Sequence, residues 1–275
     1  MSEEILKETT VAATTEIAKD AYLDVAHPAA DATGQILSLI PRAINAALLP
    51  LHQWVLQKEN NIAETKKLLE EKLKNVAPDK IVSPESYVAV PALQAIAYSM
   101  NNDEIRNMYA NLLASSMIDK IKGDVHPAFV EIIKQISPDE ARILRFVYQK
   151  NASIPVISLF LKKENGKGKQ CIIKFFNRIH RMVPDLEVRA HSKVSILIDN
   201  LVRLKLVEIH DGTYLVDDKL YEVLKNDPFI TSHTNQNAAQ NHKWDFEKTY
   251  MDLTFLGKSF CHVCVNDTIL PIGVI

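Results

Sequence analysis

In the first half of the chain, apolar residues recur every three or four positions, which is typical of amphipathic helices. Residues 1–27, 59–76 and 102–121 each carry such a stripe. In the second stretch, Glu70 and Lys74 add an ion pair one helical turn apart. The pattern predicts a front half built of helices.

The most apolar stretch is 34–56. A helix that spans a bilayer needs about 20 predominantly apolar residues. Here Pro41 and Pro50 interrupt the ladder of backbone hydrogen bonds, and Arg42 places a charge between them. We therefore expect a packed amphipathic helix, with a segment that acts on membranes as the alternative.

A continuous polar stripe runs along the helix expected at 102–121. It consists of every fourth residue, namely Asp103, Asn107, Asn111, Ser115 and Asp119. Polar stripes on helices usually face solvent. We expect a solvated face here, and a polar binding face is the alternative.

A strong helix start marks the boundary that we expect between two domains. Ser137 and Glu140 have the spacing of a capping box, and Pro138 stands in the first turn. We therefore divide the chain into a helical domain over 1–136 and a second domain over 137–275.

The second domain alternates between strand and helix patterns. A short edge strand is predicted at 154–157, because its proline at position 155 is tolerated at sheet edges. Helices are predicted at 170–181 and 192–205. A polar loop follows at 229–245, and then a strand at 248–253 leads into a final helix.

Residues 206–216 alternate between apolar and polar on both sides of Asp211 and Gly212. An Asp-Gly pair between two such runs predicts a β-hairpin with a type I′ turn. Together with the preceding elements, this gives the order of a winged helix-turn-helix. The sequence thus predicts a mainly α fold, with an N-terminal helical domain and a winged-helix-like α+β C-terminal domain.

Composition narrows the possible functions. The 275 residues include only 7 glycines and contain neither G-x-G-x-x-G nor G-x-x-x-x-G-K-[ST], which argues against the common phosphate-binding loops. The net charge of −2 does not favour binding driven by bulk charge. The sparse cysteines and the acidic N-terminus, which lacks a signal-peptide core, favour a cytoplasmic protein.

Cys261, His262 and Cys264 form a C-x-x-C pattern that could belong to a zinc or redox site. A second ligand pair at zinc-site spacing is missing, because Cys171 stands alone. We expect structural thiols packed in the last helix. No catalytic residue, metal or other cofactor is predicted.

The strongest electrostatic feature is a basic stretch at 162–181, where seven lysines and arginines stand against Glu164. Basic residues can contact phosphates, although a solvated surface is the simpler explanation. The candidate nucleic-acid-binding residues are Lys162, Lys163, Lys167, Lys169, Lys174, Arg178 and Arg181, with Lys193, Asn200 and Arg203 on the expected recognition helix.

Several segments resemble the abortive infection alpha (Abi-alpha) family of bacterial proteins, over roughly residues 60–264. They are VAPDKIVSP (76–84), VPALQAI (90–96), MYANLLASSM (108–117), LTFLGKSF (253–260) and, most specifically, VHPAFVEIIKQISPDEARIL (125–144). The residues of the last motif that we single out are His126, Pro127, Phe129, Ser137 and Pro138. The resemblance implies a role in defence against phage, and it implies no catalytic residues.

These observations lead to one preferred hypothesis and two alternatives. We expect a non-catalytic phage-defence protein that acts by binding, with a protein as the preferred partner and a nucleic acid as a second choice. The first alternative is a winged-helix regulator that binds nucleic acid. The second is an effector that acts on membranes through residues 34–56.

Overall fold

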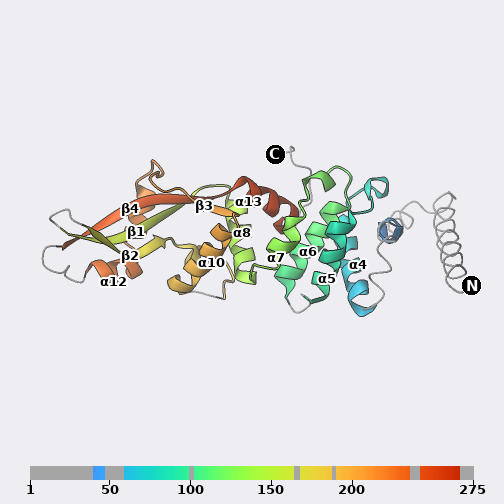
Figure 1. Cartoon of the computed structure of the whole chain (residues 1–275), viewed down its shortest axis with the longest axis horizontal. Coiled ribbons are helices and arrows are strands. Elements are labelled where there is room, and N and C mark those ends of the chain that lie inside the picture. Colours follow the sequence, from blue (N-terminus) through green and yellow to red (C-terminus); the bar gives the residue numbers. More distant parts are fainter. Residues whose placement is uncertain are drawn as a thin grey trace, which may run out of the picture.

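The protein is mainly helical and carries one four-stranded antiparallel sheet at one end of an elongated molecule (Figure 1). The computed structural model describes residues 40–46, 59–98, 102–163, 168–187, 190–235 and 242–266. Its named helices are α4 (Glu59–Leu73), α5 (Ser86–Tyr98), α6 (Asp103–Ser116), α7 (Ala128–Ile133), α8 (Pro138–Lys150), α9 (Ile179–Met182), α10 (His191–Arg203), α11 (Lys219–Lys225), α12 (Pro228–Thr234) and α13 (Phe255–Phe260). The 3-10 turns η2 (Pro78–Lys80) and η3 (Lys122–Asp124) and the π-helix η4 (Cys261–Val265) accompany them.

Helices α4 to α7 show that the described residues of the front half are mainly helical, and α8 joins them at the helical end of the molecule. The predicted starts are formed by local chemistry. Asn102 caps α6, since its side chain accepts a hydrogen bond of 3.1 Å from the backbone N–H of Ile105. Ser137 and Glu140 form the expected capping box at α8, where the Glu140 carboxylate accepts from the backbone N–H of Ser137 at 2.5 Å.

The sheet has the order β2-β1-β4-β3. Its strands are β1 (Ile154–Lys163), β2 (Lys169–Phe176), β3 (Val207–Ile209) and β4 (His242–Leu253). The prediction of a short edge strand at 154–157 was wrong in length and position, because β1 has ten residues and lies between β2 and β4. Pro155 is still tolerated, since it pairs with β4 alone and the pairing with β2 begins at Ile157.

The helix predicted at 170–181 is instead strand β2 followed by the short helix α9. Its β-branched and aromatic residues suit a strand once β1 provides a partner. The pairing shifts register twice between Ile157 and Phe160 of β1, and the extra residues lie in β2, which bulges there. There the hydroxyl of buried Ser158 accepts a hydrogen bond of 3.1 Å from the backbone N–H of Phe175. Ile173 and Phe176 of this strand are buried.

The β-hairpin predicted at 206–216 is absent from the structure, which describes all of these residues. A turn does form at Asp211 and Gly212, and Gly212 has a positive φ of 77°. However, β3 pairs with the end of β4 rather than with residues 213–216. Pairing with β4 buries Met251, whereas Val216 stays 96% exposed. The winged-helix arrangement that depended on this hairpin is therefore not confirmed.

The chain closes as predicted with a strand and a helix. Strand β4 begins six residues before the expected 248, and part of the loop predicted at 229–245 is helix α12. Residues 236–241 of that loop lie outside the described part of the chain, and its last residues, 242–245, belong to β4. Thr254 caps α13, because its hydroxyl accepts from the backbone N–H of Gly257 at 2.9 Å.

The π-helix η4 returns the chain to the helical end and packs on α6. The Asn111 amide donates to the Cys264 carbonyl at 3.0 Å, and the Ser115 hydroxyl donates to the Val263 carbonyl at 3.2 Å. Both side chains are fully buried. The prediction of a solvated polar stripe was therefore wrong at these positions, because the stripe satisfies carbonyl groups of a distant helix.

Little of the apolar stretch 34–56 is described. Residues 40–46 are helical, and Ile40 and Ile44 are buried in the main hydrophobic core. Residues 1–27 and 47–56 lie outside the described part, so the predictions made for them stay predictions. Across the described ranges, the structure contains no helix with the length and apolar character needed to cross a membrane.

The main core includes residues on both sides of Ser137, and the domain boundary placed there stays a prediction.

Candidate nucleic-acid interface

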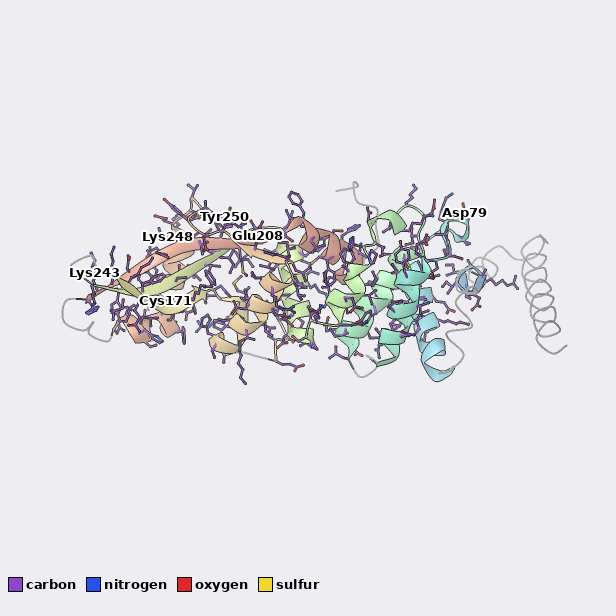
Figure 2. The ribbon with its side chains drawn as sticks, viewed as in Figure 1. Asp79, Cys171, Glu208, Lys243, Lys248 and Tyr250 are labelled. Atoms are coloured by element: carbon purple, nitrogen blue, oxygen red, sulfur yellow. The ribbon has the colours of Figure 1, made fainter. Side chains whose placement is uncertain are left out.

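Three lysines lie side by side across three strands at the free end of the sheet. Lys162 of β1 lies opposite Lys169 of β2 and opposite Lys243 of β4. Residues directly opposite on antiparallel strands project from the same face, with Cβ atoms about 4.5–5.5 Å apart. The three side chains therefore form one group, which we call the lysine row. Figure 2 shows Lys243 at the tip of the sheet.

The lysine row is partly neutralised by neighbouring carboxylates. Lys169 forms an ion pair with Glu247, and its ammonium group lies 4.3 Å from the centre of the Phe160 ring. In the described part of the chain, neither Lys162 nor Lys243 forms an ion pair. Like charges directly opposite on a sheet destabilise it. A bound anion would relieve this repulsion.

The other face of the sheet is covered, so the lysine row projects toward solvent. Leu159 of β1 lies opposite Phe246 of β4 on that covered face. Both contact a second hydrophobic cluster that includes Tyr221 of α11 and Ile230 of α12. Figure 1 shows α12 against one side of the sheet. Among the described residues, this face is therefore open at the tip of the sheet, where Lys169 and Lys243 are exposed, whereas Val156 and Thr249 of the same face are buried further in.

Two further predicted lysines lie on the same strands. Lys163 is exposed at the end of β1, opposite His242. Lys174 is exposed on β2, with its ammonium group 4.5 Å from the centre of the Phe175 ring. Lys167 lies outside the described residues. Lys163 therefore lies at the free end of the sheet with the lysine row, whereas Lys174 lies five residues farther along β2.

Arg178 and Arg181 are held by a buried carboxylate instead. The side chain of Asp227 is 1% exposed, and one of its oxygens lies 2.8 Å from Arg181 and 3.4 Å from Arg178. Both guanidinium groups therefore fasten α9 to the start of α12. These ion pairs indicate that Arg178 and Arg181 have a structural role and do not contact phosphate.

Two of the three residues predicted on the recognition helix are likewise engaged within the protein. The amide of Asn200 donates to Glu140 at 2.7 Å and to the carbonyl of Gln135 at 2.8 Å. Arg203 donates to Asn200 at 2.9 Å and to the side chain of Gln135 at 3.1 Å. Lys193 is exposed on α10. These bonds attach α10 to the start of α8.

Two histidines pack with aromatic rings below the sheet. The ring of His191 lies 4.9 Å from that of Phe176 and 6.5 Å from that of His180. Burial lowers the pKa of His191 to about 4, with a further contribution from His180. Burial also lowers the pKa of His180, and the nearby charge of Arg181 acts in the same direction. Both rings are therefore neutral near pH 7.

The motif that carries the family resemblance serves helix starts and packing. His126 Nδ1 accepts from the backbone N–H two residues later at 3.1 Å, and Pro127 precedes α7 as its N-cap. Phe129 is buried and meets the Phe260 ring edge to face at 5.4 Å. Ser137 begins α8 as described above. The residues of the family motif therefore have structural roles, because they start helices or pack in the core.

The C-x-x-C thiols are buried, as predicted for structural cysteines. Cys261 and Cys264 have no exposed surface, and burial raises the pKa of both thiols. A thiol with a raised pKa is a poor nucleophile and a poor metal ligand at neutral pH. Within the ranges that the structure describes, no group of three histidine, cysteine or acidic residues is placed to hold a metal ion.

Sequence reasoning missed the contribution of β4 to the interface. Lys243 completes the lysine row, and Trp244 follows it on the opposite face. A signal was present, since Trp244, Phe246 and Tyr250 recur at even spacing along 242–253. The preceding polar run hid the start of this strand.

Comparison with known proteins identifies the family. The family model described as abortive infection alpha matches residues 57–264, which is more than half of the chain. The chain belongs to the abortive infection alpha family. This confirms the resemblance drawn from the sequence, and the family suggests a role in abortive infection.

The other comparisons add little. No curated protein matches the chain. A solved structure of an uncharacterized protein from the hydrocarbon-degrading marine bacterium Alcanivorax borkumensis SK2 is similar at 14% identity, over 50% of this chain and 92% of that chain. Its TM-score of 0.34 is too low to support an argument about the fold.

Proposed function

We propose that this protein defends bacteria against phage by abortive infection, and that it acts in the cytoplasm by binding nucleic acid through the lysine row. Family membership supports the defence role. The observation that carries the binding role is the register Lys169–Lys162–Lys243, which places three positive charges together on an open sheet face. Lysine ammonium groups attract the phosphates of nucleic acid, and each such contact releases counterions.

The sheet face carries this proposal better than a winged-helix recognition helix does. Asn200 and Arg203 of α10 already bond to Gln135 and Glu140. An open β-sheet face binds single strands when basic residues lie beside aromatic rings on which bases can stack. Phe160 lies between the lysine row and the centre of the sheet on this face, and a base could stack on its ring if the Lys169 ammonium group, now 4.3 Å from the ring centre, turned to a phosphate.

Binding of labelled single-stranded and double-stranded nucleic acid, measured by fluorescence anisotropy at several salt concentrations, tests the proposal. The variant Lys162→Gln/Lys169→Gln/Lys243→Gln should bind much more weakly at low salt. The slope of log K against log salt should fall by about 1 for each lysine that contacts phosphate. The matched control is Lys67→Gln/Lys74→Gln/Lys120→Gln, which removes three exposed lysines from the helical end. It should bind like the parent.

Absence of binding by the parent at ~50 mM salt would exclude the nucleic-acid role. Equal losses in the two triple variants would show that binding follows net charge and not the lysine row. The defence role is tested separately by plating a broad phage panel on bacteria that express the protein. Unchanged plaque counts would contradict it, whereas protection that survives loss of the lysine row would point to a protein partner.

A further inference from the structure

A second candidate site lies between the end of α8 and the β4–α13 corner, remote from the lysine row. A half-open cleft of about 680 Å³ is present there. This volume lies within the range of about 300–1,000 Å³ that is usual for small-molecule sites. Its main polar and aromatic lining residues are Tyr148, Asn151, Asp252, Phe255, Lys258 and His262.

The cleft combines a cation, a carboxylate and neutral hydrogen-bonding groups. Lys258 is exposed beside it, and Asp252 lies at the end of β4. On the inner side, the Tyr148 hydroxyl lies 3.5 Å from Nδ1 of His262, which is 8% exposed. His262 belongs to the π-helix η4, and π-helical turns are rare and often found at functional sites.

Phe255 provides an unusual edge to the cleft. This phenylalanine is 93% exposed, although it lies next to a well-packed core. Its ring lies 6.0 Å from the ammonium group of Lys258. A flat aromatic ligand could stack on this ring while its anionic group meets Lys258. Stacking on an aromatic side chain is tolerant of base identity, because every base has a π face.

We propose that this cleft binds a nucleotide. In this arrangement the base stacks on Phe255 and a phosphate oxygen accepts a hydrogen bond from Lys258. The carboxylate of Asp252 accepts a hydrogen bond from a ribose hydroxyl. The Asn151 side chain, which also lines the cleft, bonds to polar groups of the nucleotide. This site shares no residue with the lysine row.

Isothermal titration calorimetry of the full chain tests the nucleotide site. The probes are the nucleoside 5′-monophosphates, with inorganic phosphate and the free nucleosides as separate arms. Phe255→Ala and Lys258→Gln should each weaken the affinity for a monophosphate by roughly tenfold. Tyr87→Ala and Lys120→Gln are matched controls, because they remove an exposed aromatic ring and an exposed lysine from the helical end. They should leave the affinity unchanged.

Phe255 and Lys258 are exposed, so loss of binding in their variants can be separated from unfolding by thermal denaturation. No binding of any monophosphate at millimolar concentration would overturn the proposal. Equal affinity for inorganic phosphate would also overturn it, since it would mean that Lys258 merely attracts an anion. Replacement of Lys162, Lys169 and Lys243 should not change monophosphate affinity, which distinguishes failure of this proposal from failure of the nucleic-acid interface.

Discussion

Gly257 in α13 lies so close to the backbone before β3 that even a methyl group cannot fit. A Cβ atom at this position would lie 1.9 Å from the carbonyl oxygen of Leu206 and 2.8 Å from its carbonyl carbon. Both atoms belong to the backbone, so no side-chain rotation can relieve the clash. We therefore predict that Gly257→Ala separates the start of α13 from the start of β3.

The expected cost follows from what this separation breaks. The Leu206 carbonyl accepts a hydrogen bond of 3.1 Å from the backbone N–H of Thr254, and the Thr254 hydroxyl donates to the Lys205 carbonyl at 2.5 Å. Two such bonds contribute about 1 kcal/mol each. Overpacking of a tight contact adds about 1–3 kcal/mol. The free energy of unfolding should fall by about 3–5 kcal/mol.

Gly123 offers a matched control for the same substitution. A Cβ atom there would meet nothing within 4 Å, and its φ is not in the left-handed region. Gly123→Ala should therefore be neutral or stabilise the protein by about 0.4–1 kcal/mol, through a less flexible unfolded chain. Urea unfolding followed by circular dichroism measures both variants. A Gly257→Ala variant within about 1 kcal/mol of the parent would refute the geometric reasoning.

Two further predictions concern the region below the sheet. Burial lowers the pKa of His191 from the ordinary 6.5 to about 4, so between these values the unfolded chain binds more protons than the folded one. The contribution of His191 to the free energy of unfolding should therefore be complete above pH 6.5 and decrease as the pH falls toward 4. Urea midpoints from pH 7.5 to pH ~5 should show this fall, and His191→Asn should reduce it; an identical fall in both proteins would contradict it. Asp227→Asn should lower the free energy of unfolding by about 2 kcal/mol, since it leaves the half-buried Arg178 and Arg181 without their carboxylate. Chemical denaturation of this variant beside Asp217→Asn, an exposed control, measures the loss, and equal stabilities would argue against the ion-pair role.

The helix starts could be predicted from sequence because each one is a local event. The capping box at Ser137 and the caps at Asn102 and Thr254 join groups only three residues apart. Their energy depends little on the rest of the fold. Likewise, the inner face of α8 follows from the spacing of its own apolar residues.

The sheet could not be predicted in the same way, because its partners are far apart in sequence. Strand β3 at Val207–Ile209 pairs with residues 251–253, and the nearby run at 213–216 remains unpaired. The Asp211 turn therefore formed without its hairpin. Burial of Asn111 had the same origin, since its partner carbonyl at Cys264 belongs to a helix 153 residues later. Local patterns carry no information about such partners.

Strand β4 connects the two candidate sites and also keeps them apart. It begins beside Lys243 in the lysine row and ends beside Asp252 in the cleft, which is about 30 Å of extended chain. Pairing with β1 and β3 fixes its register, and a slip of one residue would turn each side chain to the opposite face. A ligand bound at one end of β4 therefore cannot change the geometry of the other site by moving this strand. We expect the changes in free energy caused by replacing Lys243 and Lys258 to be additive in the double variant. Substitutions at distant sites that share no partner usually behave in this way.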